Sequence, residues 1–167
     1  MFDQIKKAVR ESKVCHIPNA IVSEQKIDFN YISSLLNNSN CKNKIKVDRE
    51  LGANENDILS NPFQIRKVEN ANHIAPLHKI ICEGLPDLRI DQADIFFSMK
   101  RSVGVAHVDR ENSLILGVYK NTIYRFENQD LTVVVKPGDL LLSPSGHTHF
   151  AMSYQERIII SWGLYTN

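Results

Sequence analysis

The sequence predicts an α+β protein in which helices in the first half support a β-rich second half. Apolar residues before position 94 recur mainly at helical spacing, whereas short β-prone runs separated by turn signals follow from Asp94 onward. These runs are ADIFFSMK, SLILGVY, TIYRF, LTVVV, DLLLS and RIIISWGLY. Short strands at this spacing are typical of a β-sandwich or β-barrel. Because no linker interrupts the 167 residues, we expect one domain over 1–167, mainly helical at 1–93 and β-rich at 94–167.

The first half is expected to contain a short strand and two helices. The strand covers KVCHIP at residues 13–18, and Ser23 is placed to cap the first helix, which carries apolar residues up to Leu36. The second helix is expected over about residues 64–84. Its inward-facing residues are expected to be Ile74, Leu77, Ile80 and Ile81. Between the helices, the polar residues 41–62 are interpreted as a loop or lid.

Composition restricts the partners and the compartment. The 20 basic and 19 acidic residues nearly cancel, which gives no electrostatic basis for binding nucleic acid or an anionic membrane. No apolar run approaches the roughly 20 residues that span a bilayer, and the polar start lacks the apolar centre of a secretory signal. The three scattered cysteines suit a reducing compartment better than a disulfide framework. We therefore expect a soluble, cytoplasmic protein.

The strongest chemical signal is the sequence His107-Val108-Asp109. Alternation along a strand places residues 107 and 109 on one face, so an imidazole nitrogen and a carboxylate oxygen can bind the same ion. A third ligand is available from a later β segment that carries His147 and His149. Two histidines and one carboxylate on one side of a ferrous ion leave positions open for a co-substrate and dioxygen. The pattern therefore predicts an iron(II) site.

Only one of the two later histidines can complete this set of ligands. They are two residues apart, so an extended strand would place both on the same face. Gly146 indicates that the chain is still turning at His147, and the strand is expected to begin after it. His149 is therefore the favoured ligand, and His147 is expected to support a ligand or to contact the substrate.

Arg157 begins an apolar run that continues through Ile158, Ile159 and Ile160. Such an arginine either extends its charge to solvent at the start of a strand or binds a carboxylate, for which the guanidinium fork is well shaped.

The stretch HVD…GVYKN…HFAMSYQERIIISWGLY resembles the prolyl-hydroxylase-like branch of the iron(II)- and 2-oxoglutarate-dependent oxygenases. The phrase PGDLLLSPSGHTH resembles the corresponding segment of cupin and Jumonji-C-like relatives, in which a histidine ends the phrase eleven residues after the glycine. Counting from Gly138 leads to His149. The resemblance is specific over residues 95–165 and loose before them.

The resemblance implies a double-stranded β-helix, jelly-roll or cupin-like, buttressed by N-terminal helices. It implies iron(II) as the metal and 2-oxoglutarate as co-substrate, with His107, Asp109 and His149 as the metal ligands. It also implies that Arg157 binds the far carboxylate of 2-oxoglutarate together with Tyr119, which falls on the strand after HVD.

Three more residues are candidates for contact with the co-substrate or substrate. Phe97 stands where many prolyl hydroxylases have a tyrosine near the iron, which disfavours a prolyl substrate. Lys120 either reaches the co-substrate carboxylate, as a lysine does in Jumonji-C-like relatives, or is a solvated turn residue. Asn112 either lines the substrate entrance or forms a turn.

The sequence leaves the substrate open among a free amino acid, a peptide side chain and a small natural product. Two alternatives to a 2-oxoglutarate oxygenase are a cupin-type metal enzyme without this co-substrate and a non-catalytic β-barrel binding module.

Overall fold

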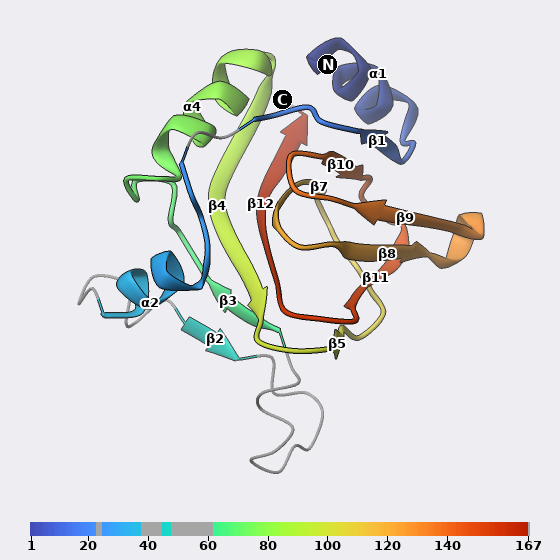
Figure 1. Cartoon of the computed structure of the whole chain (residues 1–167). Helices are drawn as coiled ribbons and strands as arrows, with labels where there is room; N and C mark the ends of the chain where they lie inside the picture. Colours follow the sequence, from blue (N-terminus) through green and yellow to red (C-terminus); the bar gives the residue numbers. More distant parts are fainter. Residues whose placement is uncertain (23–24, 38–44, 48–61, 167) are drawn as a thin grey trace.

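The computed structural model describes residues 1–22, 25–37, 45–47 and 62–166, and Figure 1 shows how their elements are arranged. The helices are α1 (Phe2–Glu11), α2 (Phe29–Asn37) and α4 (Ala75–Gly84), with the short 3-10 helix η2 (Glu127–Gln129). The strands are β1 (Cys15–Ile17), β2 (Ile45–Val47), β3 (Phe63–Ile65), β4 (Leu88–Ser98), β5 (Ser102–Val103), β6 (His107–Val108), β7 (Asn112–Tyr119), β8 (Thr122–Phe126), β9 (Leu131–Val135), β10 (Leu140–Ser143), β11 (Thr148–Ser153) and β12 (Arg157–Thr166).

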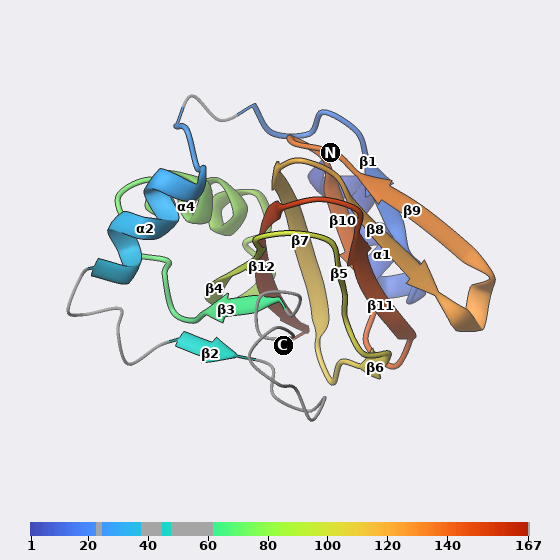
Figure 2. The ribbon, with the colours of Figure 1, turned by 60° about the horizontal axis from the view of Figure 1, so that its bottom comes forward.

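Two antiparallel sheets form the β part of the molecule. The larger sheet has the order β1-β10-β7-β12-β4-β3-β2, and the smaller has the order β5-β11-β8-β9, with β6 also pairing with β11. From β7 onward the chain passes repeatedly from one sheet to the other, so that β8 and β9 lie between two strands of the larger sheet in sequence (Figure 2). This is the expected jelly-roll arrangement of a double-stranded β-helix.

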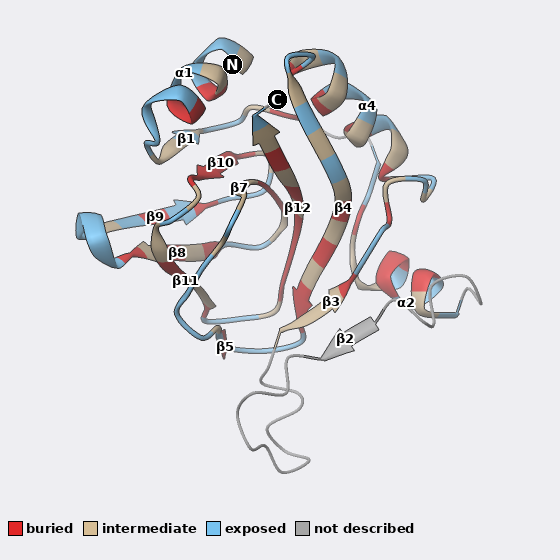
Figure 3. Ribbon diagram, turned by 180° about the vertical axis from the view of Figure 1, so that it is seen from behind, coloured by how far each residue is buried: buried red, intermediate tan, exposed pale blue. Residues whose placement is uncertain are grey.

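The larger sheet is buried on both faces at residues 157–160 of β12, which explains the unbroken apolar run there. Ile158, Ile160 and Trp162 face the core shared with the helices, whereas Ile159 packs between the sheets against apolar residues of β8 and β9. Strands covered on both sides lose the apolar–polar alternation of a half-exposed strand. Figure 1 shows α2 and α4 on the side of β4 away from β8, β9 and β11, and Figure 3 shows buried residues along β4 and β12. The helices therefore buttress the sheet as expected.

The second helix is shorter than predicted. Residues 63–65 form β3, which pairs with β4 through Phe63↔Phe97 and Ile65↔Ile95, and the helix α4 begins only at Ala75. Pairing with a long neighbouring strand outweighs the weak helical spacing of this short apolar segment. The helix ends at Gly84 as expected, but Ile80 is 42% exposed because it lies beside the buried stripe. The buried residues of that stripe are Ile74, Leu77, Ile81 and Leu85.

The first predicted helix begins at Phe29, and its cap is Asp28. The Asp28 carboxylate accepts hydrogen bonds from the backbone N–H groups of Asn30 and Tyr31, which satisfies donors that the first turn leaves unpaired. The predicted cap, Ser23, lies outside the described residues. So does most of the expected lid at 41–62, of which the structure describes only β2 and Pro62. No helix in the described ranges is long and apolar enough to cross a membrane.

Candidate metal centre

The smaller sheet brings the two best ligand candidates together. His107 on β6 and His149 on β11 are direct cross-strand partners, and both side chains line the pocket between the sheets. Asp109 lies just beyond β6, where its backbone carbonyl accepts a hydrogen bond from Gly146 in the turn before β11. Asp109 therefore reaches the pocket from a loop, although the sequence pattern placed it on a strand.

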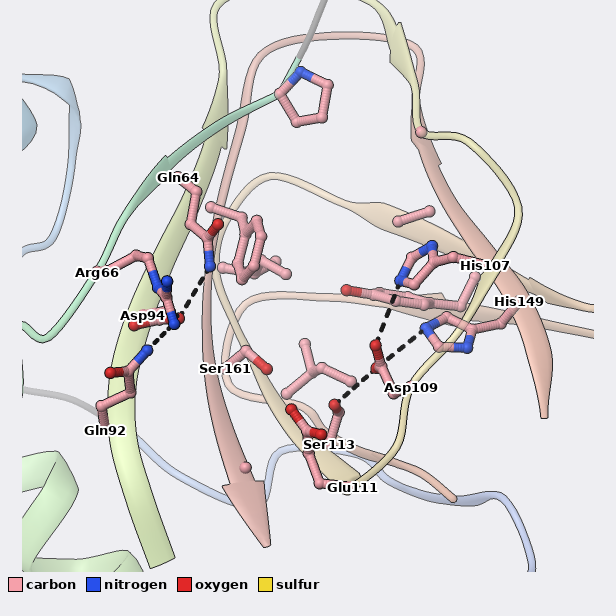
Figure 4. A pocket seen from close by; sticks show the side chains of 18 of the residues that line it. Gln64, Arg66, Gln92, Asp94, His107, Asp109, Glu111, Ser113, His149 and Ser161 are labelled. Carbon is pink, nitrogen blue, oxygen red and sulfur yellow. Dashed lines mark hydrogen bonds and ion pairs between the residues drawn. The ribbon is translucent and has the colours of Figure 1, made fainter. Parts of the chain in front are cut away.

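The three side chains converge on one point (Figure 4). His107 Nε2 lies 3.6 Å from Asp109 Oδ1, and His149 Nε2 lies 3.7 Å from Asp109 Oδ2. One ligand atom from each residue lies within 4.8 Å of the others, and no other such group of three occurs in the described ranges. These separations suit a single ion bound by each ligand at roughly 2 Å. His147 is not a member of the group.

Both imidazoles are held in the tautomer that a metal requires. His107 Nδ1 lies 2.9 Å from the Val105 carbonyl oxygen, and His149 Nδ1 lies 3.0 Å from that of His147. A carbonyl oxygen only accepts, so each Nδ1 carries a hydrogen, which leaves Nε2 of each ring as the nitrogen directed toward Asp109 and available to a metal. Burial lowers the pKa of His149, against the opposing effects of the His147 carbonyl and Asp109, and so favours the neutral ring.

His147 contributes its backbone, whereas its ring lies elsewhere. The ring Nδ1 is 3.2 Å from the Ser145 carbonyl oxygen, and the side chain does not line the pocket. The expected support of a ligand is therefore present, but it comes from the peptide carbonyl that receives the His149 hydrogen bond.

Two serines also contact the candidate metal ligands. Ser113 Oγ donates to Asp109 Oδ2 at 2.8 Å, and Ser143 Oγ lies 3.4 Å from His149 Nδ1.

The same pocket contains a buried cation. Arg157, the first residue of β12, is 2% exposed, and its Nε and Nη1 atoms have no hydrogen-bond partner among the described residues. Burial lowers the pKa of the guanidinium, but an arginine stays charged at neutral pH. A buried cation without a carboxylate partner is costly. The pocket is therefore chemically suited to an anionic ligand.

Tyr124 on β8 lies beside Arg157, and sequence analysis missed it. Tyr124 is 4% exposed and lines the pocket, and its ring centroid lies 6.3 Å from that of His149. Burial raises the pKa of Tyr124 to about 12, and the Arg157 charge and hydrogen bond act in the opposite direction. The alternation in TIYRF could have predicted that Tyr124 points inward, because Thr122, Tyr124 and Phe126 are all buried on one face of the strand.

The expectation that Tyr119 shares a carboxylate with Arg157 is wrong. Ile158 pairs with Tyr119, but Ile159 pairs with Gly117, so Val118 is the extra residue of a β-bulge between β7 and β12. The bulge turns Tyr119 toward the helices, where its ring packs edge-on against Phe29 at 5.7 Å.

Lys120 and Phe97 also lie away from the pocket. Lys120 is exposed in a left-handed turn conformation with φ of 57°, and its Nζ lies 5.5 Å from the centroid of the Tyr119 ring. Phe97 packs on the helix side of β4 and stacks on Phe63 at 5.1 Å, whereas its neighbour Phe96 lines the pocket.

Asn112 joins strands and does not line the pocket. Its Oδ1 accepts a hydrogen bond from the backbone N–H of Ser145, and its Nδ2 donates to the Leu164 carbonyl. Of its two predicted roles, contact with the substrate therefore gains no support from the position of Asn112.

The pocket measures about 580 Å³ and has a second polar cluster on its larger-sheet wall (Figure 4). Asp94 Oδ2 accepts hydrogen bonds from Gln64 Nε2 at 2.8 Å and Gln92 Nε2 at 3.1 Å. Asp94 Oδ1 accepts from the backbone N–H of Lys67, and Arg66 Nε lies 3.8 Å from Oδ2. The metal candidates and this cluster thus share one cavity with Arg157.

Comparison with known proteins shows a likeness of fold alone. No protein-family model matches the sequence, and a search of curated proteins finds no significant match. Among solved structures, the ribosomal oxygenase YcfD from Escherichia coli has a TM-score of 0.68 and 16% identity, over 93% of this chain and 48% of that chain. The same enzyme with cobalt and succinic acid gives a TM-score of 0.69 and 18% identity over the same shares. With cobalt and 2-oxoglutarate it gives 0.67 and 16%, again over 93% and 48%. This chain therefore shares the fold of those chains, a double-stranded β-helix, and spans about half of their length.

Proposed function

We propose that this protein is an iron(II)- and 2-oxoglutarate-dependent oxygenase that hydroxylates a small-molecule or peptide substrate. One observation carries the proposal. A buried arginine, with two nitrogen atoms that have no partner among the described residues, lies in the same pocket as two histidines and an aspartate that converge on one point. A metal site and a carboxylate site in one cavity are what a chelating dicarboxylate requires.

The residues that line the pocket fit both iron(II) and 2-oxoglutarate. Two imidazoles and one carboxylate form the ligand set that suits iron(II) while leaving positions open, and no cysteine of the described ranges lines the pocket. Arg157 offers its guanidinium fork to a carboxylate, and Tyr124 adds a hydroxyl donor from the opposite sheet. Bound iron(II) and 2-oxoglutarate would supply oxidative chemistry in which 2-oxoglutarate loses CO2, one atom of dioxygen enters the succinate formed and the other enters the substrate.

The protein's own contribution is positioning. His107, Asp109 and His149 fix the place of the ion, and Arg157 with Tyr124 orients the far end of the co-substrate. Apolar side chains between the sheets, including Ile115, Phe126 and Ile159, exclude water from the inner end of the pocket. Such preorganisation brings reacting groups together without the entropic cost of a bimolecular encounter.

The substrate is expected in the same pocket, where Gln64, Gln92 and Asp94 form a polar wall across from the metal candidates. The candidates stay a free amino acid, a peptide side chain and a small natural product. The described cysteines, Cys15 and Cys82, are free thiols and support the proposed cytoplasmic location.

The two alternatives leave Arg157 unexplained. A cupin-type enzyme without 2-oxoglutarate needs the metal ligands but not a buried, unpaired cation. A non-catalytic binding module needs neither the converging ligands nor their matched tautomers.

Anaerobic titration tests the proposal. Iron(II) followed by 2-oxoglutarate should give the weak visible charge-transfer band of the chelate in the wild-type protein, and Asp109→Ala should abolish it. Absence of the band, together with no iron-dependent 2-oxoglutarate binding by calorimetry, would refute the proposal. A substrate screen that monitors succinate release then identifies the class of molecule oxidised.

A further inference from the structure

Two serines are direct partners beneath the candidate metal centre. Ser113 on β7 and Ser143 on β10 pair across the larger sheet. Ser113 lines the pocket and Ser143 is fully buried. Both serines belong to the larger sheet, but each contacts a candidate metal ligand that comes from β11 or from the loop after β6. Ser113 contacts Asp109, and Ser143 contacts His149.

Ser113 forms a hydrogen bond to Asp109, the one candidate metal ligand that lies outside a strand. Asp109 lies beyond the end of β6, where the hydrogen bond from the Gly146 N–H holds its backbone carbonyl but does not fix the direction of its side chain. The Ser113 hydroxyl donates to Asp109 Oδ2 at 2.8 Å, a charge-assisted hydrogen bond with a near-ideal length (Figure 4). This contact restrains rotation of the carboxylate and leaves Oδ1 facing His107 Nε2.

Ser143 is the cross-strand partner of Ser113, but its hydroxyl is not needed to orient a candidate metal ligand. Its Oγ lies 3.4 Å from His149 Nδ1, but that N–H already donates to the His147 carbonyl at the shorter distance of 3.0 Å. Removal of the Ser143 hydroxyl therefore leaves the His149 ring oriented by the backbone.

We propose that Ser113 is a positioning residue that sets the Asp109 carboxylate in its metal-binding orientation and couples it to the larger sheet. The inference rests on the proposed function, because it assigns Ser113 a role only if Asp109 binds the metal. Hydrogen-bonded partners of metal ligands orient those ligands, and their loss typically weakens metal binding about 10- to 100-fold.

The test compares Ser113→Thr with Ser113→Val in cobalt(II) titrations followed by d–d absorption. Threonine and valine have nearly the same shape and both favour strands, so the two variants differ in the hydroxyl alone. The Val variant should bind cobalt about 10- to 100-fold more weakly, with altered d–d bands. The Thr variant should stay within a few-fold of wild type. Ser143→Ala is the matched control in the same sheet and should also stay within a few-fold.

Equal cobalt affinity and equal spectra for the Thr and Val variants would overturn the role of Ser113 while leaving the metal site intact. Equally weak binding by both variants would overturn it too, because the hydroxyl would then not be the determinant. If wild type and Asp109→Ala bind cobalt equally, the proposed function fails, and the role of Ser113 fails with it.

Discussion

The Arg157 guanidinium lies beside the Tyr124 hydroxyl, and the two side chains come from opposite sheets. Arg157 starts β12 of the larger sheet, Tyr124 lies in β8 of the smaller sheet, and each influences the ionisation of the other. Because Nε and Nη1 of Arg157 have no partner in the part of the chain that the structure describes, Tyr124 does not satisfy the cation by itself. The pair therefore forms a site with capacity for one more acceptor group, such as a carboxylate.

Arg157→Ala should weaken 2-oxoglutarate binding much more than metal binding. Hydrogen bonds to charged groups contribute about 1.5–3 kcal/mol, which corresponds to roughly a 10- to 100-fold increase in the dissociation constant. Arg157→Lys should recover only part of the loss, because an ammonium cannot reproduce the guanidinium fork. Anaerobic calorimetry with metal present gives both constants. An unchanged dissociation constant for 2-oxoglutarate in the Arg157→Ala variant would show that Arg157 has a structural role only.

Tyr124→Phe should weaken 2-oxoglutarate binding by about 10- to 100-fold, the range expected for loss of one hydrogen bond to a carboxylate. Tyr119→Phe is the matched control, since its hydroxyl lies on the helix side of the sheet, and it should leave the constant unchanged. The same calorimetric titration measures both variants. A larger effect from Tyr119→Phe than from Tyr124→Phe would restore the assignment made from the sequence.

His149→Ala should remove most metal affinity, whereas His147→Ala should change it by no more than a few-fold. The substitutions are identical and two residues apart, but His147 supports its neighbour through a backbone carbonyl that alanine retains. Cobalt(II) titration distinguishes the two. Comparable losses in both variants would mean that the His147 side chain takes part in the site.

Asp139 should make the stability of the protein depend on acid pH. Burial alone would raise the pKa of this carboxyl group, but hydrogen bonds from the backbone N–H groups of Asn19 and Lys136 and from His16 outweigh it and lower the pKa. The folded state thus binds fewer protons than the unfolded state. The stabilisation is fully present above the unfolded pKa of about 3.9 and is lost as pH falls through the folded value.

Asp139→Asn should therefore cost about 1–3 kcal/mol at pH 7, and the difference from wild type should shrink as pH falls from about 5 toward 3. Urea denaturation across this range provides the free energy of unfolding. A difference that is constant with pH would show that the ionised carboxylate is not the stabilising species.

The metal candidates could be predicted because their signal is local. A histidine two residues before an aspartate, followed by a histidine after a turn, needs only the spacing of extended chain. The sheet pairing His107↔His149 then brings the two imidazoles together. The prediction did not require knowing that Asp109 lies past the end of its strand.

The partner of Arg157 could not be predicted in the same way. Alternation along β7 would have placed Tyr119 on the pocket face with Ser113 and Ile115, but the bulge at Val118 reverses the face. A bulge depends on the register between two strands far apart in sequence, so no local pattern reveals it.

The choice of face in β4 has a similar origin. Phe96 and Phe97 are adjacent and equally apolar, and only the packing of the helices on one side decides which of them meets the pocket. The strand β3 was missed because three residues give too short a pattern to separate strand from helix.

The most direct test of a shared metal and co-substrate site is a crystal structure of the protein grown anaerobically with cobalt(II) and 2-oxoglutarate. We expect anomalous density for one ion bonded to His107 Nε2, the Asp109 carboxylate and His149 Nε2, with the far carboxylate of 2-oxoglutarate hydrogen-bonded to Arg157. An ion bound without these three residues, or a dicarboxylate that leaves Arg157 unpaired, would contradict the proposed function.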